Sequence, residues 1–174
     1  MDMLAALECV VGEHERIRGH LKLVGDSLSD REAVQTVEKS RINLLENISQ
    51  PLSVRLEAVL KALATLAEGL KNHYAFEEAE LPPILGEVLT RAMEIEHKEL
   101  LEEIESAKSV LLRTKLEGLT EDEKIVEQAL IIGLLDRIER KKQDHMQAEE
   151  TVLKMARVAL EAGRNRKAST TPLA

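Results

Sequence analysis

The chain carries long runs of aliphatic residues at helical spacing, separated by short clusters of Gly, Ser and Pro. Apolar residues that recur every three or four positions line one face of an α-helix, whereas a half-buried strand alternates at every second position. Four long helices are expected, with a shorter run between the first two: about 2–28, 30–47, 51–80, 82 to Gly118, and 120–161. Thr120 and Glu123 form a capping-box pattern, and Pro51 and Pro82 occupy first helical positions. The sequence therefore predicts an all-α, up-down four-helix bundle with a possible extra short helix at about 30–47.

The bundle is expected to span residues 1–162, because Gly163 is followed by a polar, basic segment. That segment, 163–174, is predicted to be a disordered tail. Within the short run at 30–47, the expected apolar face consists of Val34, Val37, Ile42 and Leu45.

Composition excludes several classes of protein. The net charge of -8 argues against nucleic-acid binding, which requires an excess of Lys and Arg. No apolar run approaches the roughly 20 residues needed to span a bilayer, and the N-terminal stretch lacks a basic leader. Cys9 is the only cysteine, so no intrachain disulfide can form and a reducing compartment is expected. The sequence predicts a soluble cytoplasmic protein with no nucleic-acid or membrane partner.

Four of the five histidines fall on four different predicted helices, each in line with the apolar stripe of its helix: His14, His73, His97 and His145. Residues seven apart on a helix lie within about 20° of each other. His73 is seven residues after Leu66, and His97 is seven before Ile104, so both point inward. His20, six residues after His14, is about 120° away from it and is expected at the surface.

Two carboxylates accompany these histidines at a fixed spacing. Glu77 follows His73 by four residues and Glu149 follows His145 by four, which places each carboxylate about one turn, roughly 6 Å, from its imidazole on the same face. A second Glu follows in both places, at 78 and 150, and an EH pair occurs at 13–14 and again at 96–97. Two hairpins packed about a pseudo-twofold axis would bring four imidazoles and two carboxylates into one layer.

Such a layer predicts metal binding. Buried ionised carboxylates need compensating charge, and two divalent metals provide it; imidazole with carboxylate suits iron, manganese or zinc. A single inward His is usually a hydrogen-bonded core residue, and a single HxxxE is a common surface pair. The repetition of both features along the chain favours the metal site over these simpler interpretations.

These motifs resemble the hemerythrin-like, or HHE cation-binding, family, whose pattern is His on the first helix, HxxxE on the second, His on the third and HxxxE or HxxxxD on the fourth. The matching residues are His14, His73 with Glu77, His97, and His145 with Glu149 or Glu150. The resemblance covers residues 5 to about 160 and includes Leu81 and Pro82 after the second motif. It implies a non-haem diiron centre in a four-helix bundle, with the carboxylates bridging two irons and the histidines as terminal ligands.

The sequence departs from oxygen-carrying hemerythrins on the third helix. They have a second His four residues before the position of His97, where this chain has Met93. Glu94 could supply a ligand at ExxH spacing, although a single ExxH is weak evidence and a solvent-facing Glu is the favoured interpretation. Water or Tyr74 could also fill the position. Tyr74 directly follows the second-helix His, where hemerythrin domains of F-box iron sensors have an extra ligand.

Tyr74 and Phe76 are the only aromatic residues in the chain, apart from histidine. Helix geometry places them about 100° and 60° to either side of His73. One hypothesis is that Phe76 shields the metals from water while Tyr74 donates a hydrogen bond to, or ligates, one iron. The other is that both rings fill space where metal ligands leave too little aliphatic core.

The resemblance implies a protein that holds two iron ions, with manganese or zinc possible, and that binds or reacts with dioxygen, peroxide or nitric oxide, or senses or stores iron. Its expected partner is a small diatomic or peroxide ligand. No catalytic residue and no protein partner are assigned, and the helix spacing favours Glu149 over Glu150 as the second bridge. The alternative is a regulatory or interaction bundle with a structural metal site, for which 30–47 is the candidate surface.

Overall fold

The computed structural model describes residues 3, 28–47 and 49–169. Four helices make up the regular structure in these ranges: α2 (Leu28–Glu46), α3 (Leu52–Glu80), α4 (Pro82–Arg113) and α5 (Glu121–Ser169). The helix predicted at 2–28, with His14 and His20, lies outside the described residues. No helix in the described part of the chain is both long enough and apolar enough to cross a membrane.

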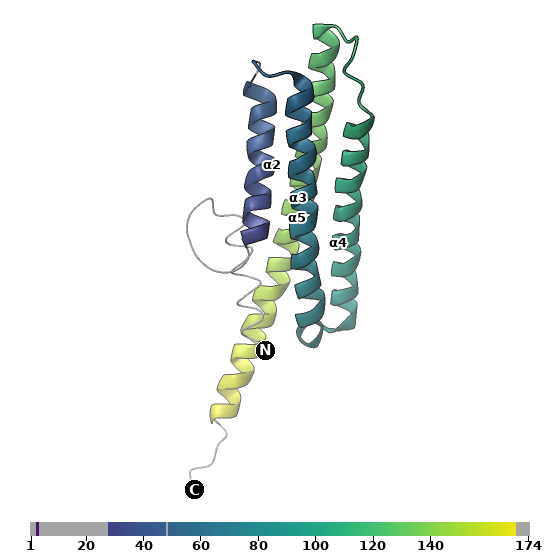
Figure 1. Cartoon of the computed structure of the whole chain (residues 1–174). Helices are drawn as coiled ribbons and strands as arrows, with labels where there is room; N and C mark the ends of the chain where they lie inside the picture. Colours follow the sequence, from purple (N-terminus) through teal and green to yellow (C-terminus); the bar gives the residue numbers. More distant parts are fainter. Residues whose placement is uncertain (1–2, 4–27, 48, 170–174) are drawn as a thin grey trace.

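The helices form an up-down bundle, as the sequence predicts. α2 packs on α3, α3 on α4 and α4 on α5, and α2 also contacts α5. Figure 1 shows α2 beside one half of α3 only, while the C-terminal part of α5 extends beyond the other helices. The prediction of an all-α bundle is confirmed.

The short helix expected at about 30–47 is present as α2, and it is packed into the bundle. The side chain of Leu44 is completely buried. The backbone carbonyl oxygen of Leu44 accepts a hydrogen bond from the buried guanidinium of Arg55 on α3. It accepts another, at 2.7 Å, from the side-chain amide of Gln128 on α5. Arg41 adds an ion pair at 3.0 Å to Asp136 of α5. α2 is therefore attached to two neighbouring helices.

The apolar face predicted for this helix was partly wrong. Ile42 and Leu45 are exposed, whereas Val34 and Val37 pack against the core together with Leu44. Val34, Val37 and Leu44 are spaced by three and seven residues, which is one continuous helical stripe. Ile42 lies about 80° or more around the helix from all three, and Leu45 lies at the edge of the stripe, about 20° beyond Val34.

Several helix boundaries follow the local chemistry of the sequence. The backbone N–H of Thr120 donates to Glu123 at 2.7 Å, and the Glu123 N–H donates back to the Thr120 hydroxyl at 3.3 Å, so the predicted capping box is present. The hydrogen bonds from Thr120 lower the pKa of Glu123. Gly118 adopts a positive φ of 79° in the turn before this box, after α4 has ended at Arg113.

The structure also departs from the sequence prediction inside α4 and at the end of α5. α4 is interrupted at Gly86, where φ is 78° and ψ is 164°, a conformation that favours glycine because it has no Cβ. α5 continues to Ser169, beyond the end expected near residue 161. The helix thus enters the segment predicted to be a tail, and the division of the chain at residue 162 stays a prediction.

The apolar core is divided into two parts along the bundle axis. The larger cluster contains buried residues from all four helices, among them Leu44, Leu63 and Leu100. The smaller cluster centres on Leu81 and Leu153, with Phe76, Ile84, Leu85, Met93, Ala156 and Leu160 packed against it. The positions between the two clusters on α3, α4 and α5 are those of the predicted metal ligands.

Candidate metal centre

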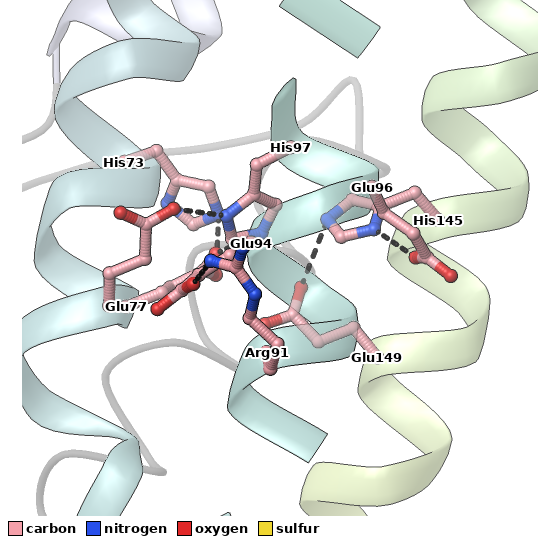
Figure 2. Close-up of polar contacts among 9 residues, drawn as sticks. His73, Glu77, Arg91, Glu94, Glu96, His97, His145 and Glu149 are labelled. Carbon is pink, nitrogen blue, oxygen red and sulfur yellow. Dashed lines mark hydrogen bonds and ion pairs between the residues drawn. The ribbon is translucent and has the colours of Figure 1, made fainter. Parts of the chain in front are cut away.

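Three helices contribute polar side chains to one buried layer between the apolar clusters. His73 and Glu77 come from the last turns of α3, His97 from the middle of α4, and His145 and Glu149 from α5 (Figure 2). All five are buried, and Glu77 has no exposed surface at all. The structure therefore brings together every predicted ligand that lies in the described part of the chain. Their assignment as ligands stays a prediction.

The carboxylate of Glu77 lies between two histidines. Its Oε1 is 2.8 Å from Nε2 of His73, and its Oε2 is 3.3 Å from Nε2 of His97. The first contact spans one helical turn, while the second crosses from α3 to α4 (Figure 2). Each oxygen of this carboxylate thus faces a different imidazole, and the two imidazoles belong to different helices.

The other nitrogen of two histidines is held by a carboxylate from an adjacent helix. His97 Nδ1 is 3.0 Å from Oε1 of Glu78, and His145 Nδ1 is 2.8 Å from Oε2 of Glu96. Glu78 and Glu96 are partly exposed, in contrast to the carboxylates in the layer. Nε2 of both rings is buried and makes no hydrogen bond to any described residue.

Glu149 and Glu150 have different surroundings although they are adjacent in the chain. Glu149 Oε2 is 3.7 Å from Nε2 of His145, whereas Glu150 forms an ion pair at 2.7 Å with Lys154 on its own helix. Burial, and then the nearby charge of Glu77, raises the pKa of Glu149 to about 9. Burial lowers the pKa of His145, against the opposing effect of its hydrogen bond to Glu96.

The spacing of the donor atoms fits a metal ion. Glu77, His97 and His145 each offer a ligand atom, and these atoms all lie within 4.8 Å of one another. Two donors that are each about 2.1 Å from one metal, at right angles, are about 3.0 Å apart. The observed Glu77–His contacts of 2.8 and 3.3 Å lie on either side of that value. A dication would also compensate two buried carboxylates, so the residues present fit the ion that the motif implies.

Tyr74 packs against two of these imidazoles. Its ring is stacked on His97 with centroids 3.7 Å apart and an angle of 4° between the planes, and it meets His145 edge-on at 5.7 Å. Only 3% of its surface is exposed. Tyr74 is thus part of the site, where its ring contacts the face of one imidazole and the edge of another.

The remaining candidates lie around the layer. Phe76 and Met93 are half-buried in the smaller apolar cluster, next to Leu81 and Leu153. Glu94 forms an ion pair at 2.7 Å with Arg91 on the surface of α4. It also lines a groove of about 440 Å³ between α3 and α4, together with Tyr74 and His97.

Sequence reasoning missed three residues that contact or border the site. Glu78 and Glu96 were seen only as parts of the repeated HxxxEE and EH motifs, and that repetition was the available signal. Lys142 lies three residues before His145 in the sequence, and it is 3% exposed and pairs with Glu139 at 2.6 Å. It lines a small, mostly apolar cavity of about 10 Å³ that His73, Tyr74 and His145 also border.

Comparison with known proteins agrees with this geometry. A family model described as the hemerythrin HHE cation-binding domain matches residues 5–157. No curated protein and no solved structure matches the chain. The matched range covers α2, α3 and α4 in full and all the predicted ligands, including His14, which lies outside the described residues. The chain therefore belongs to the hemerythrin HHE cation-binding family, and its buried His/Glu layer is the candidate cation site of that domain.

Proposed function

We propose that this protein is a non-haem diiron protein that binds or reacts with dioxygen, peroxide or nitric oxide. The observation that carries the proposal is the position of Glu77, whose two carboxylate oxygens face the Nε2 atoms of two histidines on different helices. One donor set consists of Glu77 Oε2 with His97 and His145. The other consists of Glu77 Oε1 with His73, and His14 is the remaining histidine ligand that the family motif implies. Iron, with manganese or zinc as alternatives, suits this mixture of imidazole and carboxylate.

The second carboxylate in the proposal is Glu149. It reaches toward His145 from within the layer, whereas Glu150 pairs with Lys154. Glu149 and Glu77 are close enough for the charge of Glu77 to raise the Glu149 pKa. Two carboxylates that share a site in this way favour two cations over one, because each dication compensates part of the excess negative charge.

The surroundings of the layer favour a small ligand. Iron bound in this layer would supply an open coordination position for such a ligand and the electrons needed to reduce oxygen or peroxide. The cavity of about 10 Å³ beside His73 and His145 is close to the minimum that holds one water molecule. Its other walls are largely aliphatic, with Val34, Leu66 and Leu70, so they favour a small, weakly polar molecule over an organic substrate.

Anaerobic titration with ferrous iron, followed by exposure to air, tests this proposal. We expect saturation near two irons per chain, with oxo-bridged ferric absorption bands after air. His14→Ala should lower the stoichiometry toward one, while His20→Ala, the matched histidine control on the same predicted helix, should retain two. A single colourless metal that air does not change would instead favour a structural metal in a regulatory bundle.

Iron sensing or storage is separated from ligand chemistry by kinetics. A ligand-binding or oxidising site should bind or react with oxygen, peroxide or nitric oxide and keep its iron through repeated cycles. A sensor or store should release or take up iron over the physiological concentration range with little change in reactivity. Repeated oxidation and reduction cycles, followed by a measurement of retained iron, distinguish the two outcomes.

A further inference from the structure

We propose that Glu78 and Glu96 are positioning residues of this centre: each fixes the tautomer and the orientation of a ligand histidine on the next helix. The role of these residues toward a metal rests on the proposed function, whereas the tautomer itself belongs to the metal-free protein. Neither residue belongs to the ligand set that the family motif defines.

The two contacts follow one pattern around the bundle. Glu78 of α3 reaches His97 of α4 at 3.0 Å, and Glu96 of α4 reaches His145 of α5 at 2.8 Å. Both distances are those of N–H···O hydrogen bonds. An ionised carboxylate can only accept, so Nδ1 of each imidazole must carry the hydrogen that is donated.

The proton on Nδ1 determines the state of the opposite nitrogen. A neutral imidazole has one ring proton, so a ring that donates from Nδ1 carries a lone pair on Nε2. Nε2 of each ring is buried and faces a carboxylate of the layer: Glu77 Oε2 is 3.3 Å from His97 Nε2, and Glu149 Oε2 is 3.7 Å from His145 Nε2. Both rings belong with Glu77 to the group whose ligand atoms lie within 4.8 Å of one another. Glu78 and Glu96 therefore present two lone pairs to the position where a metal ion would lie.

Burial separates these two carboxylates from the ligands. The side chains of Glu78 and Glu96 are 40% and 51% exposed, whereas that of Glu77 is 0% exposed. Each reaches inward from the surface and contacts the far side of an imidazole. A carboxylate in this position raises the basicity of the ring and restricts its rotation, and both effects strengthen a metal–imidazole bond.

Metal affinity provides the first test. Glu78→Ala and Glu96→Ala should each weaken ferrous iron binding by about 10- to 100-fold. Glu78→Gln and Glu96→Gln, which keep an acceptor oxygen, should recover part of the loss. Glu99→Ala is the matched control, because Glu99 is 55% exposed on the same helix as Glu96 but pairs with Lys141. Alanine variants that retain the wild-type helical content and the wild-type affinity would overturn the proposal.

Nitrogen NMR of the metal-free protein provides a second test that needs no iron. At about pH 8, where an ordinary histidine is neutral, long-range proton–nitrogen correlations report which ring nitrogen is protonated. We expect the Nδ1–H form for His97 and His145 in the wild type and in Glu99→Ala. Glu78→Ala should alter the tautomer of His97 alone, and Glu96→Ala that of His145 alone.

The two tests distinguish this proposal from the proposed function. A wild-type protein with the Nδ1–H form but no iron binding would contradict the diiron proposal and keep the tautomer assignment. The Nε2–H form in the wild type would overturn the role of Glu78 and Glu96 whatever the iron stoichiometry.

Discussion

Tyr74 and His97 stack face to face, with ring centroids 3.7 Å apart and planes inclined by 4°. At the edge of the same imidazole, Nδ1 of His97 lies 3.0 Å from Oε1 of Glu78. A ring that is restrained on its face and at its edge has little freedom to rotate, so Tyr74 orients a predicted ligand without coordination being required. This contact accounts for one of the two aromatic rings in a chain whose core is otherwise aliphatic.

Substitution of Tyr74 tests whether its ring or its hydroxyl matters. Tyr74→Phe keeps the stacked ring, so we expect unchanged iron affinity and an unchanged visible spectrum. Tyr74→Leu removes the stacking and leaves space beside His97, so it should lower the free energy of unfolding by about 2 kcal/mol and weaken iron binding. Iron titration followed by absorption spectroscopy measures both effects. Loss of a visible band in Tyr74→Phe would show that the phenol ligates iron.

Metal binding should stabilise the bundle strongly. Glu77 and Glu149 are buried side by side with histidines, and a cation compensates their charge. At a ferrous concentration 100-fold above the dissociation constant, linkage contributes about 2.7 kcal/mol per site. Thermal unfolding should therefore shift upward on anaerobic addition of iron and return on addition of a chelator. A melting temperature that neither reagent changes would contradict metal binding in this layer.

The metal-free protein should lose stability as the pH rises from about 7 to 9. Because the folded-state pKa of Glu149 is raised to about 9, the folded protein holds a proton that the unfolded chain has already released. Each increase in pH through this window therefore favours the unfolded state. The pKa of His145 is lowered, so its effect has the opposite sign and is confined to pH below its ordinary value of 6.5.

Urea unfolding of the metal-free protein at several pH values measures the slope of the unfolding free energy against pH. Glu149→Gln, which cannot ionise, should flatten it. Glu123→Gln is the matched control: the Glu123 pKa is lowered and that residue is exposed, so this variant should keep the slope. An equal slope in Glu149→Gln would assign the effect to another group.

Adjacent glutamates on α5 should differ in their effect on iron. Glu149 faces His145, whereas Glu150 pairs with Lys154. We expect Glu149→Gln to abolish or halve the iron stoichiometry, and Glu150→Gln to retain it near two with at most a change in affinity. Iron analysis after gel filtration distinguishes the variants. The reverse order of effects would make Glu150 the second bridge.

The place of α2 in the bundle can be tested with two neighbouring leucines. Leu44 is fully buried, so Leu44→Ala should cost about 2–5 kcal/mol of unfolding free energy. Leu45 is 44% exposed, and Leu45→Ala should change stability by less than about 0.5 kcal/mol. Denaturant unfolding of both variants gives the comparison. Similar small losses of unfolding free energy in both variants would indicate that the packing of α2 contributes little to the stability of the bundle.

Much of the site follows from the sequence because its geometry is local. His73 and Glu77 are one helical turn apart, so the four-residue spacing alone places their side chains together, and the structure puts Nε2 and Oε1 at 2.8 Å. Thr120 and Glu123 form a capping box for the same reason. The alignment of three described histidines with apolar stripes likewise predicts that they lie inside the bundle.

The contacts between helices could not be predicted from residue spacing within one helix. The rotation of α2 depends on which of its side chains the neighbouring helices cover, and packing buries Leu44 while it leaves Ile42 and Leu45 exposed. The interruption at Gly86 and the burial of Lys142 also depend on what packs around them. None of these features leaves a periodic signal in a single sequence.

The sequence by itself determined the helical class, the presence of an inward His/Glu layer and the spacing within each HxxxE pair, because the regular turn of the helix converts sequence distance into direction. Only the tertiary structure decided that Glu77 lies between His73 and His97, that Tyr74 stacks on His97, and that Glu78 and Glu96 hold histidines on the next helix. Those contacts depend on the offset and rotation of one helix against another, which are set by the packing of whole side chains and not by the spacing of residues along one chain segment.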